Sequence, residues 1–287
     1  MVLKSVMLFC CLLHSFLYGL SQQDLRSGWY RATLFRPDQQ EVVFQFQLQF
    51  EHQKPVMYIK NAAEKLRVDD LRMKDDSLFI SMPFFESDFN VKVLANGNWS
   101  GVWLRGTTSG FESMPFEASF ARNERMVSYA SPQVNINGNW QVSIRRPNGT
   151  LRPATASFRQ TGSYLEGTFL TPTGDYRFLE GIVSRDTMRL SCFDGSHAYY
   201  FSAIVKNKQL TDGMFYSGLN GLEQWTAEYN EVASLPDTTP VVQLKPNENT
   251  VAFAYPDLEG KIVSIADARY RGKVVLVQIM GSLHYTH

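Results

Sequence analysis

The segment Phe44–Phe50 alternates strictly between a large apolar residue and glutamine. In an extended chain neighbouring side chains point to opposite faces, so the apolar residues share one face and the glutamines share the other. No amphipathic helix can be drawn through the same residues. The pattern therefore predicts a β-strand with one buried face, and the abundance of Phe, Tyr and Val elsewhere in the chain favours the same kind of element.

Short runs of this kind recur between residues 138 and 229, separated by turn residues such as Pro147-Asn148-Gly149 and Asp212-Gly213. The predicted strands are Trp140–Ile144, Ala154–Gln160, Tyr164–Leu170, Tyr176–Ile182, Met188–Phe193, Tyr199–Val205, Gln209–Tyr216 and Gln224–Tyr229. Short antiparallel strands in this number favour a small up-and-down barrel, because closure removes exposed strand edges. A two-sheet sandwich is the main alternative.

The sequence also predicts that this β module occurs twice, at residues 28–120 and 138–229. The matched segments are Gly28-Trp29 with Asn139-Trp140, Arg36-Pro37 with Arg146-Pro147, Asp76–Ser81 with Asp186–Ser191, and Gly101–Gly106 with Gly213–Gly218. Small differences in spacing between these matches are typical of loop insertions after a duplication. The predicted fold class is therefore mainly β, with two tandem duplicated antiparallel barrel-like modules.

The segments outside the modules have different compositions. Residues 1–21 combine Lys4, an apolar run and small residues before Gln22, which predicts a signal peptide and an exported protein of the periplasm or cell envelope. An uncleaved anchor is the alternative, although the apolar run is short for a membrane span. Residues 231–250 contain three prolines and few apolar residues, so we interpret them as a linker.

Charge and composition exclude several classes of protein. Lys plus Arg equals Asp plus Glu at 28 each, which gives no argument for binding nucleic acid or an anionic membrane. A hydrophobic content of 44% is ample for buried cores and excludes global disorder. After signal cleavage we expect no stable membrane span.

The last segment, residues 251–287, carries a family resemblance. Phe253–Ile265 reads as strand, turn and strand, and Arg269-Tyr-Arg-Gly-Lys273 leads into the apolar run Val274–Met280. This order is similar to the start of the thioredoxin-like domain in exported bacterial redoxins, a family of TlpA-like disulfide reductases and alkyl hydroperoxide reductase or thiol-specific antioxidant proteins. The segments Met82–Glu86, Leu170–Gly181 and Leu190–Gly195 resemble the long N-terminal region of that group.

The resemblance implies a thioredoxin-like α/β domain that is truncated before its Cys-x-x-Cys motif, since Leu283–His287 follow Gly281-Ser282 where the cysteines would stand. It further implies thiol-disulfide oxidoreductase or peroxiredoxin chemistry in intact relatives, with a disulfide-containing substrate or a cell-envelope partner. Because the reactive cysteines are absent, we expect this chain to be inactive, with no catalytic, cofactor-binding or metal-binding residue.

Three other groups of residues are candidates for chemistry. Cys192, Asp194 and His197 form a local cluster, but a buried apolar cysteine beside a loop histidine is the favoured interpretation. His284 and His287 have ligand-like spacing without further ligands nearby. The tryptophans could line a ligand cavity, although packing in the cores is favoured: they are Trp29, Trp99, Trp103, Trp140 and Trp225.

Two asparagines, Asn98 and Asn148, fit the glycosylation sequon, which matters only in a eukaryotic secretory pathway. The alternative to a redoxin is a noncatalytic pair of β modules in the cell envelope that binds a protein, a glycan or a small ligand. This alternative rests on the large share of the chain that the two modules occupy.

Overall fold

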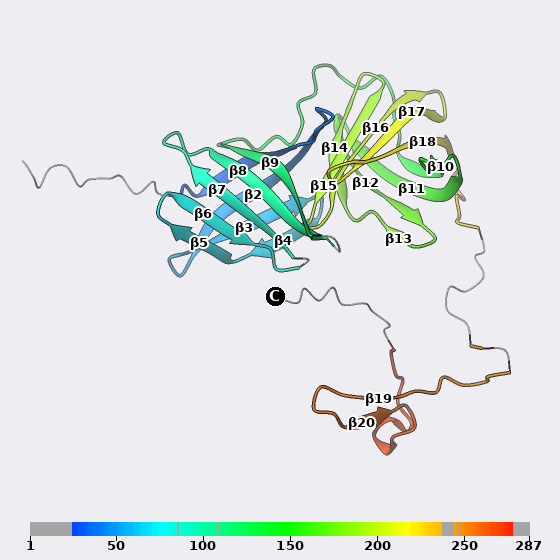
Figure 1. Cartoon of the computed structure of the whole chain (residues 1–287). Coiled ribbons are helices and arrows are strands. Elements are labelled where there is room, and N and C mark those ends of the chain that lie inside the picture. The colour runs from blue at the N-terminus through cyan, green and yellow to red at the C-terminus, as the bar shows by residue number, and fades with distance from the viewer. Residues whose placement is uncertain (1–24, 85, 108–109, 237–243, 246, 278–287) are drawn as a thin grey trace, which may run out of the picture. The chain divides into compact units, whose positions relative to one another are not determined.

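The computed structural model describes residues 25–84, 86–107, 110–236, 244–245 and 247–277. The chain divides into two compact units, with the boundary after Pro236. The first unit contains two antiparallel sheets, which we call barrel 1 and barrel 2, and they are formed by strands β1–β9 and β10–β18 (Figure 1). The chain is thus mainly β, as the alternating pattern predicted.

Barrel 1 is a sheet of nine strands in the order β4-β3-β2-β1-β9-β8-β7-β6-β5. Its strands are β1 Gly28–Phe35, β2 Glu41–Glu51, β3 Lys54–Asn61, β4 Glu64–Val68, β5 Asp70–Lys74, β6 Ser77–Ser81, β7 Ser87–Val93, β8 Trp99–Thr107 and β9 Gly110–Phe120. Consecutive strands pair with each other, except that β4 and β5, which follow one another around Asp69, do not. Strand β1 also pairs with β9.

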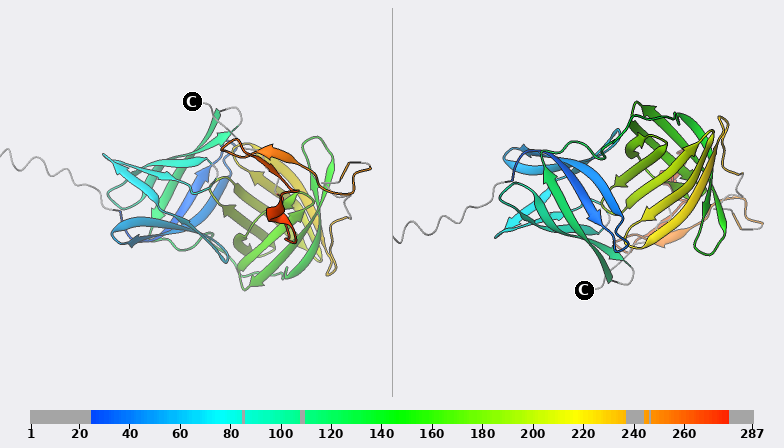
Figure 2. Two further views of the ribbon diagram at one scale, coloured as in Figure 1. Left: turned by 90° about the horizontal axis from the view of Figure 1, so that it is seen from below. Right: turned by 90° about the horizontal axis from the view of Figure 1, so that it is seen from above.

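Barrel 2 follows the same up-and-down path and closes on itself. Its strands are β10 Gly138–Arg145, β11 Leu151–Thr161, β12 Tyr164–Thr171, β13 Gly174–Asp175, β14 Leu179–Ser184, β15 Thr187–Phe193, β16 Ala198–Lys206, β17 Gln209–Ser217 and β18 Gly221–Tyr229. The β11–β12 pairing completes the ring β10-β11-β12-β14-β15-β16-β17-β18. The barrel prediction is therefore confirmed here over the sandwich alternative, and Figure 2 shows both barrels from two further directions.

Burial follows the alternation in the sequence. On β2, Phe44, Phe46 and Leu48 are fully buried in the core of barrel 1, whereas Phe50 at the end of the strand is 48% exposed. Burying large apolar side chains of this kind stabilises a fold by about 1.5–3 kcal/mol each. The core of barrel 2 is built in the same way around Trp140, Phe169, Phe201 and Trp225 and excludes solvent.

The two barrels share local geometry at several matched positions. The turns after β1 and β10 have the same backbone bonds, from the amides of Arg36 and Arg146 to the carbonyls four residues later. Likewise, Ser77 and Thr187 open β6 and β15 with a hydroxyl donated to the preceding aspartate, at 3.2 and 3.1 Å. The β1–β2 and β10–β11 turns and the starts of β6 and β15 are therefore equivalent in the two barrels.

One expected match is wrong by a residue. Tyr30, and not Trp29, is the counterpart of Trp140: both are buried, and each donates its polar hydrogen to the carbonyl four residues earlier, at 2.8 and 3.0 Å. Gly28 and Gly138 precede them with positive φ angles, and a Cβ on either would lie 3.0 Å from an aromatic ring of the last strand. The error arose because both sequences contain a tryptophan near the strand start, and Trp29 points to the outer face.

The core of barrel 1 contains a side chain from barrel 2. Phe193, at the end of β15, is fully buried among barrel 1 residues, with its ring centroid 4.3 Å from Phe44 in a stacked arrangement. The rings of Phe89 and Trp103 contact it edge-on, with centroids at 5.6 and 5.5 Å. Ala198, which starts β16, belongs to the same core. The β15–β16 hairpin thus completes the packing of barrel 1.

The second unit does not form a thioredoxin-like domain. It contains β19 Ala254–Pro256, β20 Ile262–Ser264 and a single 3-10 turn, Ala268–Tyr270. The hairpin agrees with the expected strand, turn and strand, but residues 273–277 form no strand, and Val274 and Leu276 are 103% and 93% exposed. The predicted redoxin fold is wrong for the described chain, because a parallel-sheet core strand requires helices on both faces and the described residues form no α-helix.

The described residues also contain no helix that is long and apolar enough to cross a membrane. The predicted signal peptide, residues 1–21, lies outside the described residues, as do Leu283–His287. The predicted linker begins with a turn at Glu231 and continues without regular structure in its described part.

Replacing Phe193 tests whether the barrels fold as one unit. We expect Phe193→Ala to lower the free energy of unfolding by about 3–5 kcal/mol, because it leaves a cavity in the core of barrel 1. Urea denaturation followed by tryptophan fluorescence measures the loss. The matched control is Phe178→Ala, whose ring is 51% exposed and whose loss we expect to cost under about 0.5 kcal/mol. A loss below 1 kcal/mol for Phe193→Ala would contradict the packing role.

Candidate functional site

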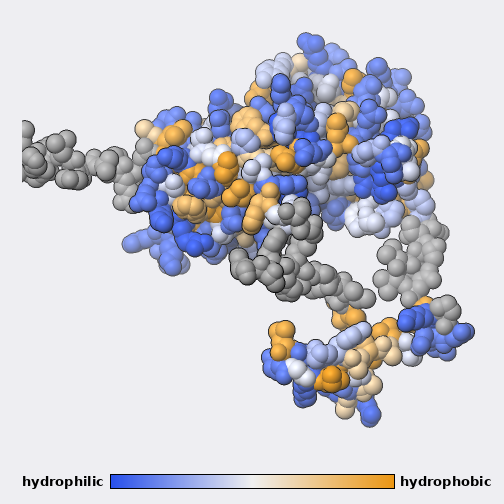
Figure 3. All heavy atoms as spheres, in the orientation of Figure 1, coloured by the Kyte–Doolittle hydropathy of each residue, from blue (hydrophilic) through white to orange (hydrophobic). Residues whose placement is uncertain are grey.

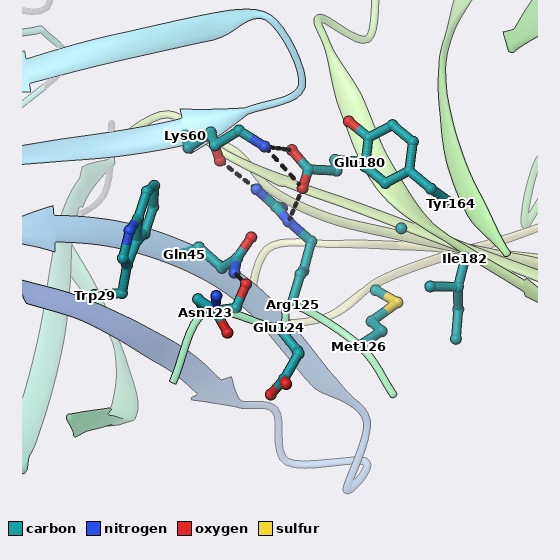
Figure 4. Close-up of a pocket in the computed structure, with 11 residues that line it drawn as sticks. Trp29, Gln45, Lys60, Asn123, Glu124, Arg125, Met126, Tyr164, Glu180 and Ile182 are labelled. Atoms are coloured by element: carbon teal, nitrogen blue, oxygen red, sulfur yellow. Dashed lines mark hydrogen bonds and ion pairs between the residues drawn. The ribbon is translucent and has the colours of Figure 1, made fainter. Parts of the chain in front are cut away.

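A cavity of about 390 Å³ lies where barrel 1, barrel 2 and the connection between them meet (Figure 4). We call it the junction cavity. Its lining comprises Trp29, Gln45 and Lys60 of barrel 1, Asn123–Met126 of the connection, and Tyr164 with Glu180–Ile182 of barrel 2. Strands β1, β2 and β3 carry Trp29, Gln45 and Lys60 on their outer face, since the alternate residues of these strands fill the core.

Arg125 lies in the middle of this lining and binds both barrels. Its guanidinium donates to the carbonyl of Ser191 at 3.1 Å and to the hydroxyl of the same residue at 3.2 Å, both on β15. On barrel 1 it donates to the carbonyl of Lys60 and to the side-chain oxygen of Asn61, the latter at 3.3 Å. The side chain is only 2% exposed, so these bonds replace the water that the charge has lost.

Glu180 supplies the opposite charge. Its carboxylate accepts from the Lys60 ammonium at 3.1 and 3.2 Å and from the backbone amide of Ala62 at 2.6 Å. One carboxylate oxygen is 4.0 Å from Nε of Arg125, and that Nε is buried without a hydrogen-bond partner. The two cations and the carboxylate form a compact network that spans the interface.

The charged network is flanked by apolar and aromatic surface. Trp29 lies on one side, beside Gln45, while Met126, Ile182 and the ring of Tyr164 lie on the other (Figure 4). Such a combination of apolar walls and a few convergent polar groups is typical of small-molecule sites.

Burial and neighbouring charges act on the ionisation of Tyr164 and Arg125 in this cavity. Burial raises the pKa of the Tyr164 phenol above its ordinary value, and the charges of Glu180 and Glu166 act in the same direction, so the phenol stays protonated. Burial lowers the pKa of Arg125, but the nearby Glu180 opposes this, and an arginine remains cationic in proteins. The network therefore presents fixed charges and donors to a ligand.

The residues of the cysteine cluster lie in different environments. Cys192 is fully buried in the core of barrel 2, and burial raises the pKa of its thiol well above the ordinary range. His197 lies in the β15–β16 turn, where its Nδ1 is 3.0 Å from the carboxylate of Asp194. Burial opposes ionisation of Asp194, but bonds from His197 and Ser196 outweigh it and lower the pKa of that carboxyl. The favoured interpretation, a buried cysteine beside a loop histidine, is confirmed.

The remaining candidates fall in three places. His284 and His287 lie outside the described residues, and within the described part of the chain no group of His, Cys, Asp and Glu is arranged to hold a metal ion. Four tryptophans, Trp99, Trp103, Trp140 and Trp225, are core residues, whereas Trp29 lines the junction cavity. Asn98 bonds to the amide of Phe120 at 2.9 Å, and Asn148 caps the exposed turn before β11.

Sequence reasoning missed the residues that build the junction. Arg125 belongs to the connection between the modules, and no pattern of period two or matched motif distinguishes it from exposed neighbours such as Arg122. Lys60 and Glu180 lie on strands whose existence the sequence indicated, but only the arrangement of the two barrels brings them together.

Comparison with known proteins does not assign this chain to a family. No protein-family model matches the sequence, and no curated protein matches it. Among solved structures, a Nitrosomonas europaea protein provisionally named AttH shows 9% sequence identity over 72% of this chain and 93% of that chain, with a TM-score of 0.16. At that TM-score the likeness carries no argument. Together with the nearly all-β structure, these findings overturn the resemblance to thioredoxin-like proteins.

Removal of the buried guanidinium tests the network. We expect Arg125→Met to destabilise the protein by about 3–5 kcal/mol, because Glu180 and the acceptors around it lose a buried partner. Arg125→Lys should restore little of this, since an ammonium cannot reproduce the fork of donors. Chemical denaturation measures the loss, with Arg122→Met as the exposed control. Equal stability of the two methionine variants would show that Arg125 does not clamp the barrels.

The environment of Cys192 predicts an unreactive thiol. We expect iodoacetamide to alkylate Cys192 at less than about one-tenth of the rate seen in guanidinium chloride, because only the thiolate reacts and burial suppresses it. Because the raised pKa keeps the thiolate a minor fraction at both pH 7 and pH 9, the native rate should stay below the denatured rate at either pH. Mass spectrometry of the alkylated peptide gives the rate at this residue alone, and rapid native alkylation would contradict the burial.

Proposed function

We propose that this protein is noncatalytic and binds a small amphipathic ligand in the junction cavity. The observation that carries the proposal is the composition of that cavity, in which Trp29, Met126 and Ile182 surround a buried network of two cations and a carboxylate. A volume of about 390 Å³ falls within the range of ligand pockets.

The position of the cavity also supports the proposal. Two barrels and a connection contribute to it, and sites of small ligands are frequent at such boundaries. The network holds its polar groups in place before a ligand arrives, which reduces the ordering cost of binding.

The proposed place of action is the periplasm or cell envelope. This part of the proposal rests on the composition of residues 1–21, which is typical of a signal peptide. A cytoplasmic pool of the full-length chain would contradict it, as measured by fractionation of cells that express the protein.

A probe with aromatic rings and one anionic group tests the cavity. We expect 1-anilinonaphthalene-8-sulfonate to bind saturably at one site per chain and to quench the fluorescence of Trp29. Trp29→Ala and Ile182→Lys should each weaken binding at least tenfold, because one removes an aromatic wall and the other places a long charged chain in the cavity.

The matched control for this experiment is Phe50→Ala, which removes a half-exposed aromatic ring of barrel 1 outside the cavity. Its affinity should equal that of the wild type, and the melting temperatures of all variants should be compared to exclude unfolding as the cause. Probe binding that is absent, or unaffected by both cavity substitutions, would show that the junction is a structural contact and no ligand site.

A further inference from the structure

The two barrels differ in the strand that precedes their last strand. In barrel 2 the register of β17 against β18 shifts between Leu210 and Gly213. As a result Thr211 and Asp212 together lie opposite a single residue of β18, Thr226. In barrel 1 the register of β8 against β9 runs without a shift. Strand β17 therefore contains a β-bulge that β8 lacks.

The bulge sets the backbone of Asp212 in the left-handed region, with a φ of 53°. Asp adopts this conformation more readily than most residues. Asp212 is exposed, and it lines a hollow on the outer face of barrel 2. Bulges often redirect a side chain beside a functional site. The bulge of β17 thus supplies a carboxylate to this hollow.

The hollow, which we call the bulge hollow, has a volume of about 400 Å³ and extends over four neighbouring strands. One row of directly paired residues crosses β11, β10, β18 and β17: Leu151, Arg145, Gln224 and Met214. A second row runs from Ser143 to Thr226 and ends at the bulge. Paired residues on one face of a sheet have Cβ atoms about 4.5–5.5 Å apart, so the polar groups form a continuous array.

The polar groups of this array are open to a ligand. Within the described residues, the side chains of Ser143, Arg145, Gln224 and Thr226 make no hydrogen bond or ion pair. The Asp212 carboxylate accepts a hydrogen bond from the hydroxyl of its neighbour on the bulge, at 3.2 Å, and its other oxygen is unused there. Arg145, Asp212 and Gln224 are also exposed, so a ligand reaches them without displacing protein contacts.

A polar outer surface alone would not mark a site, since Figure 3 shows that the visible outer surface of barrel 2 is mainly hydrophilic. The duplicated barrel provides a comparison. The residues of barrel 1 that correspond to Arg145, Met214 and Gln224 are Phe35, Val102 and Pro115. The polar array and the bulge therefore occur together in barrel 2, and neither is present at the matched place in barrel 1.

The charges of the bulge hollow balance each other. Among its lining residues, Arg145 is the cation and Asp212 is the carboxylate. A charged ligand of either sign would meet one like charge, so the lining favours a neutral ligand. The guanidinium, the carboxylate and the Gln224 amide are planar groups with two neighbouring polar atoms each. Two adjacent hydroxyls of a sugar ring match such a pair of atoms, because a hydroxyl both donates and accepts.

From this array we propose that the bulge hollow binds a neutral saccharide. Its hydroxyls bond to Arg145, Gln224 and Asp212, and its C–H face lies against the apolar side chains of Leu151 and Met214. Leu151 is 59% exposed and offers this surface at the end of the row. The bulge hollow shares no lining residue with the junction cavity, so the two sites are independent.

Isothermal titration of the full-length protein with neutral tetrasaccharides tests this proposal. The probes are cellotetraose, maltotetraose and chitotetraose, and at least one of them should bind saturably at one site per chain. A tenfold increase in ionic strength should change its affinity less than twofold, because the ligand carries no charge to be screened. Gln224→Ala and Asp212→Asn should each weaken binding about tenfold, since each removes hydrogen bonds of the array.

Two controls separate this result from other effects. Gln49→Ala removes a glutamine from the outer face of β2 in barrel 1, outside the bulge hollow, and should leave the affinity unchanged. Trp29→Ala should also leave it unchanged, because Trp29 lines only the junction cavity.

The two test variants differ in their effect on the backbone. Asn is chosen at position 212 because it also adopts a positive φ, so the bulge is kept. If Asp212→Asn nevertheless lowers the melting temperature, Gln224→Ala still reports on the site, since the exposed Gln224 side chain has no partner to lose within the described residues.

Three results would overturn the proposal. The first is the absence of saturable binding by all three tetrasaccharides at millimolar concentration. The second is binding that neither Gln224→Ala nor Asp212→Asn weakens. The third is binding that Trp29→Ala abolishes while Gln224→Ala leaves it intact, which would place the saccharide in the junction cavity instead of the bulge hollow.

Discussion

A single buried guanidinium fixes how the two barrels of this protein meet. Arg125 takes its bonds from β15 on one side and from the end of β3 on the other, and it is almost completely shielded from water. A buried charge is tolerated only when its partners are in place, so the geometry of both barrels is constrained by the same five-donor group. The junction cavity exists because this clamp and the Lys60–Glu180 pair hold the barrels together beside a partly open space.

The interface between the two barrels contains both apolar and polar contacts. Phe193 enters the core of barrel 1, and next to it the side chain of Asn61 bonds to the backbone of Phe193 at 2.8 and 3.3 Å. Further out, Arg105 donates to the carbonyl of Ser196 at 3.0 Å, and Arg36 to carbonyls of the β17–β18 turn. The apolar contact stabilises the interface by burial, whereas the directional bonds determine the register of one barrel against the other.

Much of the strand content could be predicted from the sequence, because period-two alternation reflects burial on one face. The predicted strands of barrel 2 coincide with those observed to within three residues at their ends, and only the two-residue strand β13 was not predicted. The two Arg-Pro pairs show that matched sequence positions can differ in burial. Arg36 is buried against barrel 2, while its counterpart Arg146 is exposed. The thioredoxin-like interpretation failed because a short apolar run does not specify which elements cover it.

The packing of Phe193 has a consequence for the order of synthesis. Every strand of barrel 1 leaves the ribosome before the β15–β16 hairpin has been made, so at that moment its aromatic core lacks one ring. Without that hairpin, barrel 1 has a vacant place beside Phe44, Phe89 and Trp103, and such a place is open to other apolar segments. The core of the N-terminal barrel is thus completed by residues translated much later.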